Sequence, residues 1–289
     1  MNYVEYRQQI AADLAARTAA YQQSVAAPAV DAAMAGPRPL HLLADGDSWF
    51  DYPLGGAVPL VTCTDVIAQL PGLCAPAPKI LNLAHHGDAT TTEVGLARTQ
   101  KLINAIQDPA NGGFDAILFS GGGDDVAGDP FNIWLNDAAS VGGNPAFGLN
   151  QTRFNGVLSV IEASYLDLIE LRDENLPGAP IFCHAYDIAL PTGVGVCTEG
   201  PWLKPALDYC GWAGNPAGEA QIVKQALTQL AALLQRLAAD PANNLIFVPT
   251  QGTLAPDQWA NELHPTPEGF RLIAARFQAA LAARFPGRC

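Results

Sequence analysis

Short apolar runs alternate with longer stretches of helical periodicity along most of the chain. Five runs have strand length and are apolar at nearly every position, as expected for strands that are covered on both faces. They span residues 40–44, 79–84, 114–120, 179–184 and 244–250. Elsewhere apolar residues recur every three or four positions, which indicates helices. The predicted helices span residues 65–70, 91–107, 151–172, 217–239 and 267–284.

The alternation of strands and helices predicts an α/β fold, with a parallel sheet between two layers of helices. The sequence has no internal repeat and no low-complexity linker, so we expect one domain over residues 1–289. Residues 1–21 have an amphipathic helical pattern, and we assign residues 1–36 to an N-terminal helical extension. Segments 128–149 and 190–214 are rich in loop-forming residues, and we expect them to be insertions near a functional site.

Composition and charge restrict the partners of this protein. Hydrophobic residues make up 49% of the chain and charged residues 15%, which is enough for a sizeable core. The net charge of −13 disfavours nucleic acids and anionic membrane surfaces, because both are bound largely through Lys and Arg. No apolar stretch could span a bilayer, and the N-terminus lacks the apolar centre of a signal peptide. We therefore expect a cytoplasmic protein without integral membrane association.

The six cysteines leave two interpretations open. Cys63 and Cys74, and likewise Cys197 and Cys210, lie in loop-like segments and could close small loops in an oxidising compartment. Free thiols in a reducing compartment are the alternative. No Cys or His spacing is typical of a zinc site, so we expect no metal.

Polar clusters follow the carboxyl ends of all five predicted strands. In chain order they are Asp47-Ser48, His85 to Asp88, Gly121 to Asp125, His184 to Asp187, and Asn261 to Thr266. Because the carboxyl ends of parallel strands meet at one edge of a sheet, we expect these clusters to converge. A serine hydroxyl there becomes a nucleophile only with a base for its proton and donors for the resulting oxyanion.

The ordered blocks resemble those of the SGNH (GDSL-type) hydrolases. The matching blocks are Gly46-Asp47-Ser48, Gly87, Gly122 to Asp125, and His264-Pro265, and the resemblance covers about residues 40–285. It implies a flavodoxin-like three-layer α/β/α sandwich with a five-stranded parallel sheet. It also implies an esterase that acts on a small-molecule or lipid acyl ester, without a metal or an organic cofactor.

The resemblance assigns roles to four positions. Ser48 matches the nucleophile, and His264 matches the general base that takes its proton. The backbone N–H groups of Ser48 and Gly87 match two oxyanion donors, and glycine at position 87 lets the backbone approach the reacting carbonyl closely. Position 124 matches the third donor.

Two residues depart from the family pattern. Asp124 occupies the position of an asparagine, yet an ionised carboxylate accepts hydrogen bonds and cannot donate one to an oxyanion. Either burial and Asp125 hold Asp124 protonated, or the chain is a weakened or altered enzyme. Asn261 occupies the position of the triad acid, so a backbone carbonyl or the Asn261 side-chain carbonyl could hold the His264 Nδ1–H in a Ser–His dyad, unless Glu262 or Asp187 substitutes for the acid.

Other residues and functions stay open at this point. Asp47 could support the site, and five aromatic residues could line an apolar acyl pocket or pack in the core: Trp49, Phe50, Tyr186, Trp202 and Trp259. An acyltransferase and a non-catalytic binding protein on the same scaffold are the alternative functions. A magnesium-dependent phosphatase built on Asp45, Asp47, Asp124 and Asp125 is disfavoured, because it leaves the His264-Pro265 block unexplained.

Overall fold

Five parallel strands form the central sheet in the order β2-β1-β3-β4-β5. The structure is a computed structural model, and it describes residues 2–26, 36–52, 64–93, 95–196 and 200–289. The strands are β1 (His41–Gly46), β2 (Lys79–Asn82), β3 (Ala116–Ser120), β4 (Ile181–His184) and β5 (Leu245–Val248). Every residue of β3 and β4 is buried, which explains why these runs are apolar throughout.

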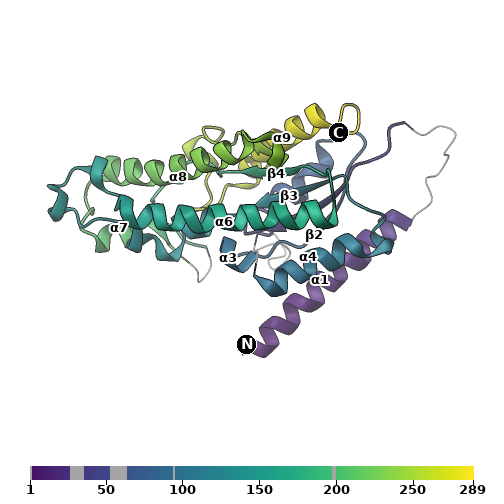
Figure 1. The fold of residues 1–289 in the computed structure, drawn as a ribbon. Helices are drawn as coiled ribbons and strands as arrows, with labels where there is room; N and C mark the ends of the chain where they lie inside the picture. The colour runs from purple at the N-terminus through teal and green to yellow at the C-terminus, as the bar shows by residue number, and fades with distance from the viewer. Residues whose placement is uncertain (1, 27–35, 53–63, 94, 197–199) are drawn as a thin grey trace.

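Helices cover both faces of the sheet (Figure 1). On one face α4 (Leu96–Gln107), α6 (Gln151–Asn175) and α8 (Pro216–Ala238) pack in sequence against one another. On the other face α2 (Val66–Gln69) packs against α9 (Pro267–Arg284). This three-layer arrangement is the predicted fold class, and each of the five predicted strands is present with slightly different ends.

Short helices fill the connections and contain much of the two predicted insertions. The α-helical pieces are α3 (Thr90–Glu93), α5 (Gly123–Ala127) and α7 (Leu203–Tyr209). The 3₁₀ turns are η1 (Leu70–Gly72), η2 (Pro109–Asn111), η3 (Asp129–Trp134), η4 (Ala139–Val141), η5 (Pro145–Phe147), η6 (Pro241–Asn243) and η7 (Pro256–Gln258). In Figure 1, α6 and α8 project past the sheet towards α7, so the insertions gather at one end of the molecule.

Helix α1 (Tyr3–Ala26) covers the edge strand β2. Arg17 donates to the Ala84 carbonyl at 3.2 Å, and the Tyr21 ring stacks on Phe114 with centroids 5.6 Å apart. A covered edge leaves fewer backbone groups open to pairing with another chain. Most of the predicted extension is this helix, whereas residues 27–35 lie outside the described part.

The strand register brings the candidate site to one edge of the sheet. Gly46 at the end of β1 lies opposite Ser120 at the end of β3. Gly46 has φ +141°, and a Cβ there would lie 2.3 Å from the Ser120 carbonyl oxygen. Only glycine fits this close approach, and it places Asp47 and Ser48 directly beyond the sheet.

Cys74 and Cys289 form a disulfide with a Cα–Cα distance of 4.3 Å. Both interpretations given for Cys74, a pairing with Cys63 and a free thiol, are therefore wrong, because the chain end after α9 returns to the loop before β2. Cys183 and Cys210 are free thiols, whereas Cys63 and Cys197 lie outside the described residues.

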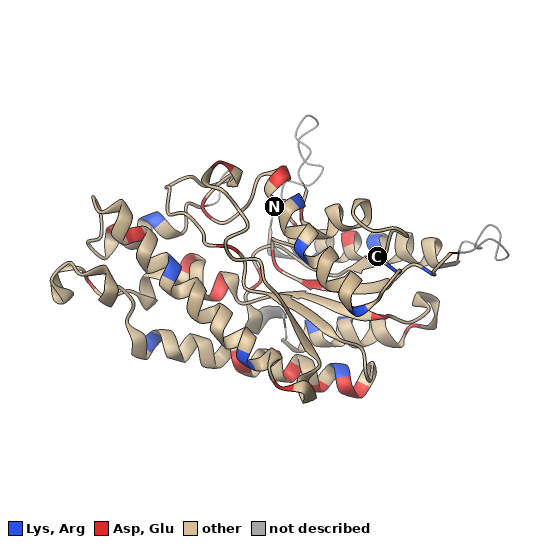
Figure 2. Ribbon diagram, turned by 90° about the horizontal axis from the view of Figure 1, so that it is seen from above, with Lys and Arg blue, Asp and Glu red and all other residues tan. Residues whose placement is uncertain are grey.

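Figure 2 shows Asp and Glu spread over many helices and loops rather than gathered on one element. Within the described ranges, no helix combines the length and the apolar character needed to cross a bilayer.

Candidate active site

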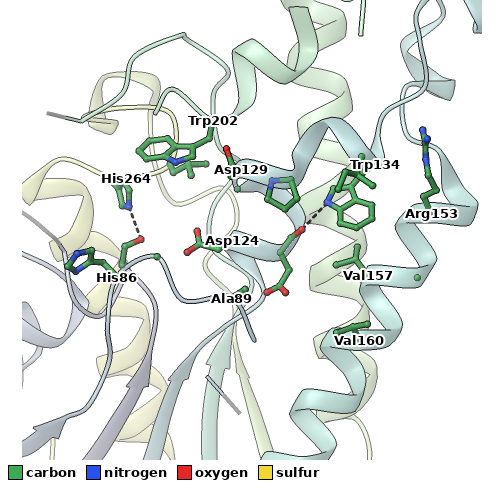
Figure 3. Close-up of a pocket in the computed structure, with 18 of the residues that line it drawn as sticks. His86, Ala89, Asp124, Asp129, Trp134, Arg153, Val157, Val160, Trp202 and His264 are labelled. Atoms are coloured by element: carbon green, nitrogen blue, oxygen red, sulfur yellow. Dashed lines mark hydrogen bonds between the residues drawn. The ribbon is translucent and has the colours of Figure 1, made fainter. Parts of the chain in front are cut away.

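The structure brings the Ser48 hydroxyl and the His264 imidazole together at the carboxyl edge of the sheet. Ser48 lies in the turn after β1, and His264 precedes α9. Ser48 Oγ is 2.7 Å from His264 Nε2 (Figure 3). Both residues are buried by the surrounding chain, yet both line a cavity. This is the geometry that transfer of the hydroxyl proton to the imidazole requires.

Asn261 orients His264 through its side-chain oxygen. Asn261 Oδ1 lies 2.9 Å from His264 Nδ1 and also accepts from the backbone N–H groups of Leu263 and His264, each at 3.0 Å. Because this oxygen accepts hydrogen bonds, Nδ1 carries the ring proton. Nε2 is then left with the lone pair that accepts the Ser48 hydroxyl.

Tyr52 supports this arrangement, and the sequence analysis missed it. Asn261 Nδ2 donates to the Tyr52 hydroxyl at 3.3 Å, which helps to fix which end of the amide faces His264. The Tyr52 ring also packs edge-on against the imidazole, with centroids 4.8 Å apart. Nothing in the sequence around Tyr52 signals this contact.

The environment keeps the His264 imidazole neutral. Burial, and to a smaller extent the nearby His86, lower the pKa of His264 to about 3. Asn261 carries no charge that would stabilise an imidazolium. His264 therefore remains a free base at ordinary pH.

The two candidate substitutes for a triad acid are engaged elsewhere. The Glu262 carboxylate accepts from the backbone N–H groups of Gly193, Trp202, Leu203 and Lys204, and so fastens the start of α7. The Asp187 carboxylate accepts from four N–H groups, those of Ile188, Gly252, Thr253 and Leu254. Both expectations of an acid partner for His264 are therefore wrong, since these carboxylates hold loops in place.

Asp47 belongs to a buried network behind Ser48. It accepts from the Trp49 N–H at 3.0 Å and from the Ser120 hydroxyl at 2.7 Å, and the Tyr186 hydroxyl donates to its other oxygen. Burial raises the pKa of Asp47 to about 6, while these hydrogen bonds favour the charged form. The network anchors the turn that carries Ser48.

A second Ser–His pair lies inside this network. Ser120 Oγ is 2.9 Å from His184 Nε2, and both residues are fully buried. His184 Nδ1 accepts from the Tyr186 N–H at 3.2 Å, so Nε2 carries the proton and donates to Ser120. The Ser120 hydroxyl in turn donates to Asp47. This imidazole therefore has no lone pair available to take a proton from Ser120.

A cavity of about 660 Å³ opens beside Ser48 and His264. Its mouth includes Gly87, which has φ +77°, and Asp124, which Figure 3 shows between His264 and Trp134. Most of the other lining side chains are apolar: Ala89, Pro130, Ile133, Trp134, Val157, Val160, Val196, Trp202 and Leu263. The size and apolar lining are those of a small-molecule site.

The aromatic residues separate into lining and core. Trp202 lines the cavity, as expected. Trp49, Tyr186 and Trp259 instead border a crevice of about 20 Å³, which has room for about one water molecule. Phe50 is fully buried against His184 and Phe277, so the expectation that it contacts substrate is wrong.

The two acidic residues of α5 have different surroundings. Asp125 is buried, and its carboxylate accepts from the Thr90 N–H at 2.8 Å, so it ties α5 to α3. Burial raises the pKa of Asp125. Asp124 is half-buried and lines the cavity beside Ser48.

The carboxylates proposed for a magnesium site face hydrogen-bond donors. Asp45 is buried in an ion pair with Arg98, which also binds Asp88 at 2.9 Å. Asp47 is surrounded by the three donors described above. In the described part of the chain no cluster of three or more acidic, His or Cys side chains has the arrangement of a metal site.

No family model matches the sequence, and no curated protein matches it either. Solved structures, in contrast, do match this chain. An extracellular lipase from Streptomyces rimosus is 17% identical and superposes with a TM-score of 0.51, covering 83% of this chain and 99% of its own. This similarity decides the fold. The chain has the SGNH-hydrolase fold.

Other solved structures of lower similarity also match this fold. A member of the lipolytic G-D-S-L family from Veillonella parvula is 14% identical, with a TM-score of 0.46 over 86% of this chain and 99% of that one. A mutant of Axe2, an acetyl-xylooligosaccharide esterase from Geobacillus, is 17% identical, with a TM-score of 0.47 over 84% and 94%.

Within the SGNH fold, the two departures from the family pattern are reciprocal. An acid, Asp124, stands where the pattern has an amide, and an amide, Asn261, stands where the pattern has an acid. In the structure the Asn261 amide faces His264 Nδ1, and the Asp124 carboxylate lines the cavity beside Ser48.

Proposed function

We propose that this protein hydrolyses carboxylic esters through an acyl-enzyme on Ser48. Ser48 Oγ attacks the ester carbonyl carbon while His264 Nε2 takes the hydroxyl proton. The bond to the alcohol oxygen then breaks, and His264 returns the proton to the departing alcohol. Water, activated by the same imidazole, attacks the acyl-enzyme and releases the carboxylic acid.

The observation that carries this proposal is the Ser48–His264 hydrogen bond of 2.7 Å, which lies beside a cavity of about 660 Å³. The tautomer set by Asn261 leaves Nε2 as the acceptor. Gly87, at the mouth of the cavity, supports the assignment of its N–H and that of Ser48 as oxyanion donors. The lipase from Streptomyces rimosus with the same fold is consistent with this reaction class.

Hydrolysis of p-nitrophenyl acetate and labelling by a fluorophosphonate test the proposal together. We expect measurable turnover, a label on the peptide that contains Ser48, and loss of both in Ser48→Ala. Ser120→Ala is the matched control, because it removes the other serine hydroxyl that contacts a histidine. Labelling of Ser120, or turnover that survives Ser48→Ala, would overturn the proposal.

A catalytically weakened binding protein is the second candidate. Asp124 favours it, since loss of one oxyanion donor typically costs about 10²–10³-fold in rate. In that case Ser48 would resist the fluorophosphonate, while the cavity would still bind esters. The labelling experiment therefore separates the two functions.

A further inference from the structure

The cavity extends well beyond Ser48, and one face of α6 forms its far wall. Arg153, Gly156, Val157 and Val160 all line the cavity; Arg153 and Val160 each lie three or four positions from Gly156 and Val157, which places the four residues on one side of the helix. Figure 3 shows Val157, Val160 and Trp134 on the opposite side of Asp124 from His264. Ile133 and Trp134 of η3 complete this wall.

Two apolar side chains of this wall do not pack in the hydrophobic core. Val160 is 43% exposed and Ile133 is 47% exposed, and both face the cavity. Large apolar side chains that gather in a hollow next to reactive groups indicate an apolar ligand rather than packing. The Trp134 indole donates to the Asp125 carbonyl at 2.9 Å, which fixes the ring as a rigid part of the wall.

Gly156 lines this part of the cavity. It lies inside α6, where glycine costs about 1 kcal/mol in helix stability relative to alanine. A Cβ at this position would meet nothing within 4 Å, so packing against another element does not require the glycine. The space beside Gly156 is therefore open to a ligand in the cavity.

We propose that this wall, formed by Ile133, Trp134, Gly156, Val157 and Val160 and called here the α6 arm, binds an unbranched apolar acyl chain. The proposal rests on the function proposed above. His264 must return its proton to the departing alcohol oxygen, so the alcohol lies on the His264 side of the carbonyl carbon. The acyl chain then extends the other way, past Asp124 and along α6. Asp124 at the entrance disfavours an anionic acyl group, which makes a neutral aliphatic chain the expected occupant.

The first experiment compares p-nitrophenyl acetate, butyrate, octanoate and laurate. Because each buried methylene contributes about 0.8 kcal/mol, kcat/KM is expected to rise about fourfold per methylene until the arm is full. Acetate esters of alcohols of increasing length are compared in parallel. A flat acyl series, or a preference that follows the alcohol length instead, overturns the proposal.

The second experiment fills the α6 arm. Gly156→Ala, Gly156→Leu and Gly156→Phe are expected to move the preferred acyl chain to progressively shorter lengths, with the octanoate-to-acetate ratio falling at least tenfold in Gly156→Phe. Ser159→Phe is the matched control, because Ser159 is exposed on the same helix and does not line the cavity. The proposal fails if both phenylalanine variants change the ratio equally, or if neither does.

A binding measurement keeps the α6 arm testable independently of catalysis. Octanamide, a neutral probe, is titrated into the wild-type protein and both phenylalanine variants by calorimetry. Binding to wild type and Ser159→Phe, with at least tenfold weaker binding to Gly156→Phe, supports the arm even if no ester is hydrolysed. In that event the proposed function fails and the α6 arm stands, whereas equal binding by all three proteins overturns the arm.

Discussion

Two Ser–His pairs of nearly equal length lie in the described part of the chain, and in only one of these two can the imidazole accept the serine proton. The Ser48–His264 distance is 2.7 Å and the Ser120–His184 distance is 2.9 Å. In the first pair Nε2 accepts from the hydroxyl, because Asn261 holds the proton on Nδ1. In the second pair Nε2 donates to the hydroxyl, because the Tyr186 N–H occupies Nδ1. The hydrogen-bond partner of Nδ1, rather than the Ser–His distance, therefore decides whether Nε2 can accept the serine proton.

Access separates the two pairs as well. Ser48 and His264 line the cavity, whereas Ser120 and His184 have no exposed surface. Burial lowers the pKa of both imidazoles to about 3, so both rings are neutral. The buried pair belongs to the hydrogen-bond network of Asp47, whereas Ser48 and His264 face the cavity. A short distance between serine and histidine is therefore insufficient evidence for a catalytic dyad.

Removing each imidazole is the strongest test of this difference. His264→Ala is expected to lower kcat/KM for p-nitrophenyl acetate by about 10³-fold or more, because the general base is lost. His184→Ala should destabilise the protein but keep kcat/KM per folded molecule within about tenfold. Circular dichroism gives the folded fraction for each variant. Equal losses in the two variants would show that the pairs do not differ as described.

Removal of the group that orients His264 should have a smaller effect. Asn261→Ala leaves the imidazole in place but no longer fixes which ring nitrogen carries the proton. We therefore expect a loss of about 10–10²-fold in kcat/KM, which is well below the loss expected for His264→Ala. The same ester assay measures it. A loss as large as that of His264→Ala would mean that the amide is itself indispensable.

Asp124 lies on the cavity side of the Ser48–His264 pair, and its substitution tests how a carboxylate beside Ser48 affects the rate. Asp124→Asn replaces an acceptor with a donor beside the forming oxyanion, and kcat should rise at least about tenfold. Ser48→Ala/Asp124→Asn is the control, since it removes the nucleophile and should stay inactive. No change, or a loss, in the single variant would mean that Asp124 has another role.

The pH profile reports the charge state of His264. Proton transfer requires neutral imidazole, and the lowered pKa, about 3, keeps it neutral well below the ordinary histidine range. The acid limb of kcat/KM is therefore expected far below pH 6.5 in the wild-type protein. Asn261→Asp places a carboxylate beside Nδ1 and should raise that limb by about one to three pH units. A wild-type limb near pH 6.5 would contradict this account.

The smallest effect on activity is expected when the hydroxyl of Ser120, in the buried pair, is removed. Ser120→Ala leaves Asp47 with one donor fewer, which should reduce the free energy of unfolding by about 1–3 kcal/mol. Urea denaturation measures this change, while kcat/KM per folded molecule should barely move. A large loss of activity without loss of stability would assign Ser120 a direct part in the reaction.

Much of the fold follows from local patterns in the sequence. The strands were predictable because both faces of the sheet are covered, which forces continuous apolar runs such as residues 116–120. The strand order places the carboxyl ends at one edge, so the meeting of Ser48 and His264 could also be expected. The need for glycine at position 46 became apparent only in the structure, where a Cβ would lie 2.3 Å from the Ser120 carbonyl oxygen.

Hydrogen-bond partners across long separations were not predictable in the same way. Glu262 is next to Asn261 in sequence, but its carboxylate turns towards four backbone N–H groups near α7. Phe50 follows Ser48 and Trp49, yet it points into the core. The partner of Cys74 is 215 residues away. Sequence proximity carries no information about these choices, because they depend on how separate elements pack.

The sequence by itself therefore determined the layers of the fold, the edge at which the polar clusters gather, and the reciprocal exchange of Asp124 and Asn261. These features depend on residue type and on short-range periodicity, which are present in the linear chain. Only the tertiary structure decided which histidine faces an open cavity with an available lone pair, and which apolar face of α6 lines it. Those outcomes depend on the partner of each ring nitrogen and on the space left after packing, and both arise only when distant segments meet.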